Sequence, residues 1–264
     1  MEAETKVADV QAASNQAQDH GALSFTEIPG IEDEFFNLVV GSPSNPDIHP
    51  DHSADPNLLI AFDHIMKFIE GKGDLSEADK ANYSDTRVRA AKAFASLVRS
   101  RSEIEDEIRH ILRTGFPTEK HDPDYIPGLI TQGPIRIYSL CPHHLLTVEY
   151  DCHVSYIPEP NGMVLGLSKL ARIAKTLSRR PVLQEQLASD IADVLFWHKG
   201  QQVPGIRSKG SAVSLVGKHS CMSCRGVESE AMTSVAELRG VFWQPDMEMK
   251  FYQAINQIRL RLER

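Results

Sequence analysis

The sequence has no long apolar run, and its four cysteines are few for a chain of 264 residues. A membrane-spanning helix needs about 20 consecutive apolar residues, so none is expected. A disulfide-stabilised scaffold of this length needs more cysteines, and the N-terminus lacks the basic and then apolar pattern of a secretory signal peptide. We therefore expect a cytoplasmic protein with reduced cysteines and no membrane partner.

Positive charge is also scarce, with 28 Lys and Arg against 36 Asp and Glu and a net charge of -8. This balance argues against a nucleic-acid-binding surface, so any anionic ligand would have to be held by a local cationic cluster. The length allows one large domain, and we expect one domain preceded by a leader.

The expected leader covers residues 1–54, which are rich in Ala, Gln, Asn, Asp, Ser and Pro and show little periodicity. This composition predicts a mostly disordered segment. A short apolar patch at 35–40 leaves a partner-docking segment as the alternative. The domain itself would cover 55–264, with a helical part at 55–130 and a sheet-based core at 131–264.

Apolar residues at helical spacing predict a helix at 57–71 and another from Thr86 to about residue 100. Ser102 and Glu105 have the spacing of a capping box, which predicts a third helix ending at Gly115.

After Gly133 the period changes to two, and residues 146–156 alternate strictly between apolar and polar, as in a half-buried antiparallel strand. Further patterns predict a helix pair, a second strand pair and a C-terminal helix: helices at 168–179 and from Pro181, and strands at 212–225 and 232–243. This order is typical of an α+β domain built on an antiparallel sheet.

The stretch SLCPHHL, at 139–145, places Cys141 and His144 at a spacing that a tight turn closes around one ion. Thiolate and imidazole are zinc-ligand types. The matching half of such a site is found in GKHSCMSCRG, at 217–226, where Cys221 and Cys224 form a C-x-x-C pair. Buried cysteines and unrelated surface histidines are the alternative that needs no metal.

Two metal sites are compatible with these stretches. A closed structural site would use Cys141, His144, Cys221 and Cys224, whereas a catalytic site would use only the first three and keep an open position for water. On a regular strand Cys221 shares a face with His219 and Arg225, while Cys224 faces the other way. Strand alternation therefore favours the three-ligand site.

Seven stretches occur in order along the chain: DTRVRAAKAF (85–94), SLCPHHL (139–145), VSYIP (154–158), GLSKLARI (166–173), RRPVLQEQL (179–187), HSCMSCRGV (219–227) and TSVAELRGVF (233–242). With these stretches the chain closely resembles GTP cyclohydrolases of type I over about residues 84–255.

The resemblance implies that Cys141, His144 and Cys221 hold a catalytic zinc ion. It also implies a reaction in which the imidazole ring of GTP is opened, C8 leaves as formate, and the product is 7,8-dihydroneopterin triphosphate. In that reaction His143 and His219 would carry protons, because imidazole titrates near neutral pH. Ser168 matches a serine assigned to the ribose rearrangement, although helix capping would also explain it.

The residues matched to substrate binding fall into two groups. Glu185 matches the carboxylate that accepts hydrogen bonds from guanine, and Gln184 is its matched neighbour. The residues matched to the triphosphate are Lys169, Arg172, Arg225 and Arg89.

The resemblance further implies the tunnelling fold, in which antiparallel sheets of several subunits form a barrel, with active sites at subunit interfaces and usually a decamer. The product would supply pterin or deazapurine pathways. A catalytically weakened GTP-binding or regulatory relative and a structural-zinc assembly protein are the alternatives, and neither requires both His143 and His219.

Three features depart from the family's pattern. Pro142 stands where a glutamate is usual, residues 86–89 read TRVR without the family's proline, and the loop at 198–210 is longer. None of them removes an expected ligand or proton carrier, so they leave open the substrate preference and the rate.

Overall fold

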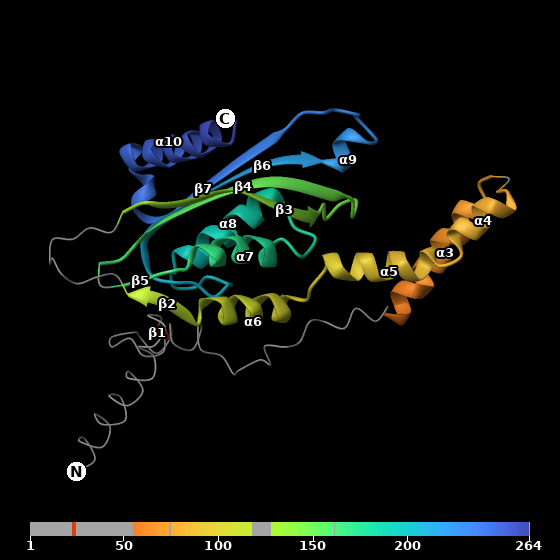
Figure 1. Ribbon diagram of the computed structural model, residues 1–264, viewed down its shortest axis with the longest axis horizontal. Helices are drawn as coiled ribbons and strands as arrows, with labels where there is room; N and C mark the ends of the chain where they lie inside the picture. The colour runs from red at the N-terminus through yellow and green to blue at the C-terminus, as the bar shows by residue number, and fades with distance from the viewer. Residues whose placement is uncertain (1–22, 25–54, 74, 118–127, 161, 264) are drawn as a thin grey trace, which may run out of the picture.

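The computed structural model describes residues 23–24, 55–73, 75–117, 128–160 and 162–263. Its centre is a four-stranded antiparallel sheet of order β3-β4-β6-β7 (Figure 1). The strands are β3 (Ile130–Leu140), β4 (Thr147–Pro158), β6 (Ser208–His219) and β7 (Thr233–Leu238). The predicted α+β class with an antiparallel sheet is confirmed.

Alternation along β4 builds the main core. Val148, Tyr150, Cys152, Val154 and Tyr156 are each at most 1% exposed and lie on one face of the sheet. Three helices cover that face in Figure 1: α6 (Arg101–Leu112), α7 (Leu167–Leu177) and α8 (Gln184–Leu195). Their buried apolar residues belong to the same core cluster as the β4 residues.

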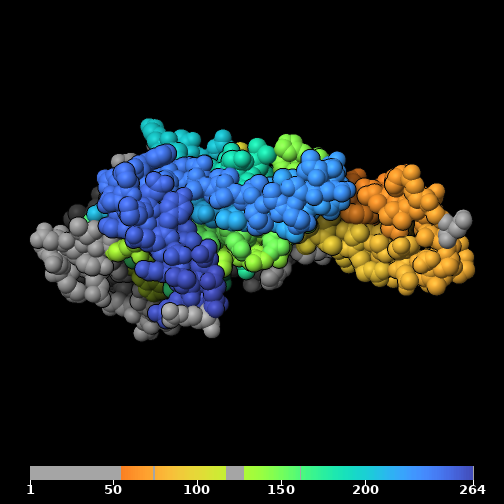
Figure 2. Space-filling model, turned by 90° about the horizontal axis from the view of Figure 1, so that it is seen from above, coloured from red at the N-terminus to blue at the C-terminus, as the bar shows by residue number. Residues whose placement is uncertain are grey.

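The C-terminal helix α10 (Pro245–Leu262) packs on the opposite face of the sheet, at one end. Ile157 of β4, Phe242 and Phe251 form a second, small apolar cluster there. Beside α10 the strands are visible from this side in Figure 2, so the helix covers only part of this face.

The N-terminal helices form an arm that projects from the end of the domain (Figures 1 and 2). It consists of α3 (Pro56–Glu70), α4 (Glu77–Tyr83) and α5 (Thr86–Leu97), and neither α3 nor α4 has a buried residue. The short helix α4 was not predicted, although Ser76 and Asp79 form a capping box that starts it. Among the described residues, no helix combines the length and apolarity that a membrane span requires.

A small sheet of order β1-β2-β5 lies beside the core; its strands are β1 (Leu23–Ser24), β2 (Thr114–Pro117) and β5 (Met163–Val164). The pair Leu23–Ser24 is the part of the predicted leader that is described, and the rest of 1–54 lies outside the described residues.

The capping box of α6 is formed by Ser100 and Glu103, not by Ser102 and Glu105 as predicted. Both pairs have the required spacing, and in the structure Ser100 and Glu103 make the two reciprocal hydrogen bonds that start the helix. The helix ends at Leu112, and Gly115 belongs to β2.

The strand predicted at 212–225 begins at Ser208 and stops at His219, where a one-turn helix α9 (Ser220–Ser223) follows. The reason is that β4 begins at Thr147, so β6 has no partner to pair with beyond the Val148–His219 position. The strand predicted at 232–243 likewise ends at Leu238, and Gly240, with φ +59, opens a 3-10 helix, η2 (Gly240–Trp243).

Candidate metal centre and substrate site

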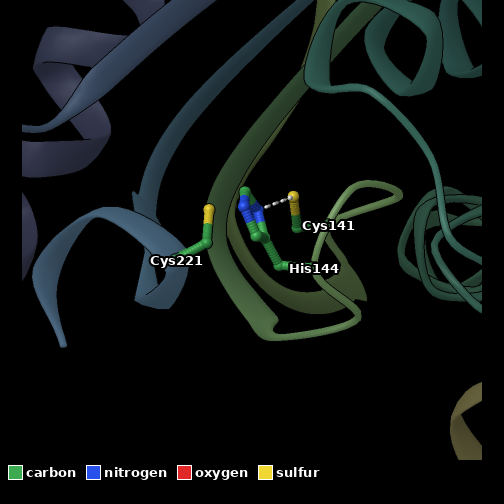
Figure 3. A group of neighbouring side chains, drawn as sticks. All are labelled: Cys141, His144 and Cys221. Carbon is green, nitrogen blue, oxygen red and sulfur yellow. Dashed lines mark hydrogen bonds between the residues drawn. The ribbon is translucent and has the colours of Figure 1, made fainter. Parts of the chain in front are cut away.

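The first half of the candidate metal centre is the tight turn between β3 and β4. Two backbone hydrogen bonds close it, from Cys141 N to Leu146 O (2.8 Å) and from Leu145 N to Cys141 O (2.9 Å). Leu145 takes a left-handed conformation with φ 54°, which is energetically unfavourable for a residue other than glycine. The turn places the His144 Nδ1 atom 3.7 Å from the Cys141 Sγ atom (Figure 3).

The second half comes from α9, which follows β6 directly. Because Val148 pairs with His219, the first turn of α9 lies beside the start of β4, and the Ser220 and Thr147 hydroxyls are 3.3 Å apart. This brings Cys221 to the turn, as Figure 3 shows. The ligand atoms of Cys141, His144 and Cys221 all lie within 4.8 Å of one another, so the group could hold a metal ion.

The donor set fits zinc, which prefers thiolate and imidazole ligands. Burial, and then a hydrogen bond and charge proximity to Cys141, raise the pKa of the Cys221 thiol. Two thiolates at this distance repel each other, which disfavours ionising both thiols. A bound cation would offset that repulsion.

Cys224 is exposed at the end of α9 and is not part of the ligand group. The strand-alternation argument that excluded it was wrong, because both cysteines lie beyond the strand. Arg225 is also beyond the strand, exposed after α9, and so does not share a strand face with Cys221 as predicted.

The two predicted proton carriers are neighbours of the ligand residues in the chain: His143 lies between Cys141 and His144, and His219 is two residues before Cys221. The His143 Nδ1 atom is 3.9 Å from the Cys141 Sγ atom. His219 ends β6, and its ring lies edge-to-face against Tyr150 with the centroids 5.8 Å apart. Burial lowers the pKa of His219, while the charge of Glu185 opposes that shift.

The predicted guanine-binding pair begins α8 next to His219. Glu185 is exposed in the first turn of the helix. Gln184 is buried, and its Oε1 atom lies 3.1 Å from the Nε2 atom of His219 and 2.6 Å from the hydroxyl of Thr233. Thr233 was not identified from the sequence, because nothing in one sequence gives the register that brings β7 to α8.

The predicted phosphate ligands Lys169 and Arg172 form a separate site at the start of α7. They line a pocket of about 380 Å³ together with His110, Ile111, Arg113 and Thr114, and none of the lining residues is acidic. Lys169 Nζ donates hydrogen bonds to the carbonyl and to the hydroxyl of Thr114. Burial, and then the charge of Arg172, lower the pKa of Lys169 to about 8. His110 and Arg113 were not predicted, because neither lies in a stretch that carries the family resemblance.

Two further predicted residues lie elsewhere. Arg89 is on α5 in the helical arm, where its Nη2 atom lies 3.3 Å from the Thr86 hydroxyl. Ser168 is exposed in the first turn of α7, whose N-cap residue is Gly166 with no side-chain cap hydrogen bond. Helix capping, the simpler explanation for Ser168, therefore does not apply.

Within one chain, the predicted phosphate pocket at Lys169 and Arg172 and the candidate metal centre lie toward opposite ends of β4. The metal centre adjoins Val148, which pairs with His219. Leu165, just before α7, donates a backbone hydrogen bond of 2.8 Å to the Tyr156 hydroxyl. A strand rises about 3.4 Å per residue, so Val148 and Tyr156 are roughly 27 Å apart.

Comparison with known proteins finds relatives over most of the chain. The family model for GTP cyclohydrolase I matches residues 62–256. The chain is 32% identical over 197 residues to GTP cyclohydrolase 1 of Lysinibacillus sphaericus, covering 74% of this chain and 93% of the relative. It is 34% identical over 181 residues to GTP cyclohydrolase 1 of Clostridium botulinum, covering 68% and 87%.

The chain therefore belongs to the GTP cyclohydrolase I family. A solved structure of the archaeosine synthase QueF-Like in its apo form is 19% identical with a TM-score of 0.32, covering 43% of this chain and 95% of that one. That similarity is too low to assign the fold on its own.

Proposed function

We propose that the protein is a zinc-dependent GTP cyclohydrolase, converting GTP and water to 7,8-dihydroneopterin triphosphate and formate. The observation that carries the proposal is the group of Cys141, His144 and Cys221, whose ligand atoms lie within 4.8 Å. A three-ligand zinc site supplies Lewis-acid chemistry and lowers the pKa of bound water to around 7.

The remaining roles belong to side chains of the protein. His143 and His219 flank the ligand group and would move protons to and from the purine ring and the departing formyl group. Glu185, exposed beside His219, would accept hydrogen bonds from the guanine N1-H and 2-amino groups. These contacts would orient C8 toward the metal centre.

Lys169 and Arg172 would bind the triphosphate, with Arg225 and Arg89 as further cationic contacts and Ser168 assisting the ribose steps. A pocket lined by several basic side chains and no acidic one suits a polyanion. Because this pocket and the metal centre lie toward opposite ends of β4, we propose that each site combines the two from different subunits. A homodecamer with interface active sites, as the family resemblance implies, provides such an arrangement.

The same geometry gives less support to the two alternative functions, a structural-zinc protein and a regulatory GTP-binding relative. A structural zinc site would use a fourth protein ligand, and Cys224 lies outside the group. A GTP-binding regulatory relative has no need for two histidines beside the ligands. Incubation with GTP, followed by oxidation and measurement of neopterin fluorescence, tests the proposal: fluorescence is expected from the zinc-loaded protein, and a zinc-loaded, GTP-binding protein that gives none would contradict it.

A further inference from the structure

The side-chain amide of Gln184 is saturated by partners within the chain. Gln184 is 5% exposed at the start of α8. Its Nε2 atom donates to the Leu215 carbonyl at 2.9 Å and lies 3.5 Å from the Thr233 carbonyl. Carbonyl oxygens only accept hydrogen bonds, so the NH2 group must face them and the amide oxygen must face the other way.

The amide oxygen is held in turn by Thr233, the first residue of β7. The Thr233 hydroxyl lies 2.6 Å from Gln184 Oε1 and 3.2 Å from the Gly217 carbonyl oxygen. A hydroxyl has one proton, and the shorter contact to Gln184 takes it. Because Thr233 pairs with Gly217 in the sheet, the position of this hydroxyl is fixed by the β6–β7 register.

The second partner of the amide oxygen is the ring of His219. Its Nε2 atom is 3.1 Å from Gln184 Oε1, which can only accept, so Nε2 must carry the hydrogen. The Tyr150 ring packs edge-to-face against the same imidazole and limits its rotation. In the neutral ring, Nδ1 is then the nitrogen with a free lone pair.

We propose that Thr233, acting through Gln184, is a positioning residue that holds His219 in the Nε2-H form and presents Nδ1 for proton transfer. The inference rests on the proposed function, in which His219 moves protons. Both donors and both lone pairs of the Gln184 amide have partners in the chain, which leaves none for guanine. Gln184 therefore orients the proton carrier, and guanine recognition falls to Glu185.

Thr233→Val tests this, because valine keeps the shape of threonine and removes only the hydroxyl. We expect kcat for GTP to fall about two- to ten-fold, the effect of one lost hydrogen bond, with KM within two-fold of wild type. Thr233→Ser should restore kcat. In protein labelled with 15N-histidine, solid-state spectra should show protonated Nε2 and unprotonated Nδ1 for His219 in the wild type and the serine variant, and a mixture of both forms in the valine variant.

The matched control is Thr131→Val, which removes a hydroxyl from a 2.8 Å pair with Ser155 elsewhere in the same sheet. It should leave kcat and the His219 signals unchanged. If the valine variant does not assemble, Thr233→Ala removes the same hydroxyl without adding a branched side chain. Unchanged kcat and His219 signals in an assembled Thr233 variant lacking the hydroxyl would overturn the inference, as would a raised KM with unchanged kcat. A wild-type protein that makes no product would refute the proposed function instead, and the nitrogen spectra would still decide the positioning of His219.

Discussion

Single residues decide which metal chemistry is possible at the β3–β4 turn. Cys141, His144 and Cys221 converge there, whereas Cys224, only three residues from Cys221, remains exposed outside the group. With three protein ligands a position stays available for water or substrate, and with four the ion would be structural. The contrast between Cys221 in α9 and Cys224 just after it therefore distinguishes a catalytic from a structural zinc site.

Cys221→Ala should lose zinc and all GTP turnover, because two remaining ligands do not hold the ion in place. Cys224→Ser, the matched change one helical turn away, should keep one zinc per subunit and wild-type turnover. Elemental analysis of the purified variants measures the metal content. Zinc loss in the Cys224 variant would point to the closed, structural site.

Lys169 makes the phosphate pocket sensitive to pH. Its pKa is lowered to about 8, so the amine is charged at pH 7 and loses its proton as pH rises through about 8. We expect kcat/KM for GTP to fall above pH 8 in the wild type, because kcat/KM reports ionisations of the free enzyme.

Lys169→Arg provides the control, since arginine keeps its charge up to about pH 12. Its kcat/KM should be lower overall, because the side chain differs in shape, but it should not show the decline near pH 8. A pH profile with the same decline in both proteins would assign the ionisation to another group.

Secondary-structure elements bring together parts that the sequence leaves separate. The ligand types and the Cys141–His144 turn could be predicted from spacing alone, and so could the alternation of β4. The exclusion of Cys224 was predicted from strand alternation, which fails because the β4–β6 pairing ends at Val148 and His219 and the chain then turns into α9. Side chains alternate between two faces only where the strand is paired. Where the pairing ends depends on tertiary contacts, which cannot be read from one sequence.

Dependence on tertiary contacts also explains why the hydrogen-bond partners of Gln184 were not predicted. A resemblance places it beside Glu185, but its contacts with His219 and Thr233 depend on the packing of α8 against the ends of β6 and β7. The pairs Ser100–Glu103 and Ser102–Glu105 show the limit locally, because both fit the capping pattern and the spacing alone does not show which pair starts the helix.

A substitution at Gly217 tests how closely β6 approaches the Tyr150 ring of β4, beside His219. It pairs with Tyr150, and a Cβ atom at Gly217 would lie 2.6 Å from two carbons of the Tyr150 ring. Gly217→Ala should therefore lower the free energy of unfolding by about 1 to 3 kcal/mol, the usual range for overpacking, and displace the ring that contacts His219. Gly128→Ala, where a Cβ meets nothing within 4 Å, should be neutral. Chemical denaturation measures both, and equal stability of the two variants would show that the Tyr150 ring moves aside freely.

At the scale of the whole molecule, the account requires more than one subunit. The phosphate pocket adjoins the Tyr156 end of β4 and the metal centre adjoins the Val148 end, while Arg89 lies on the projecting arm (Figure 1). In the proposed assembly, one chain would carry two partial sites that face different neighbours. Assembly would complete each site.

Mixed oligomers test this sharing. Arg172→Ala should weaken GTP binding about ten-fold to a hundred-fold, the usual cost of a lost charge-assisted contact, and Cys221→Ala should be inactive. When the two variants are dissociated and reassembled together, some sites would receive Cys221 from one parent and Arg172 from the other. Activity per subunit at low GTP should then exceed the mean of the parents. Activity equal to that mean, with subunit exchange demonstrated, would place both residues in one chain's site.

The most direct test of the central claim uses GTP labelled with 13C at C8. The zinc-loaded protein should release the label as formate, in amounts equal to the pterin triphosphate formed, and a chelator should stop both products together. Such matched release is expected only if the ring of GTP is opened and C8 expelled. Release of phosphate with the label still in an intact purine would contradict the account, because the protein would then act on the phosphate chain and not on the base.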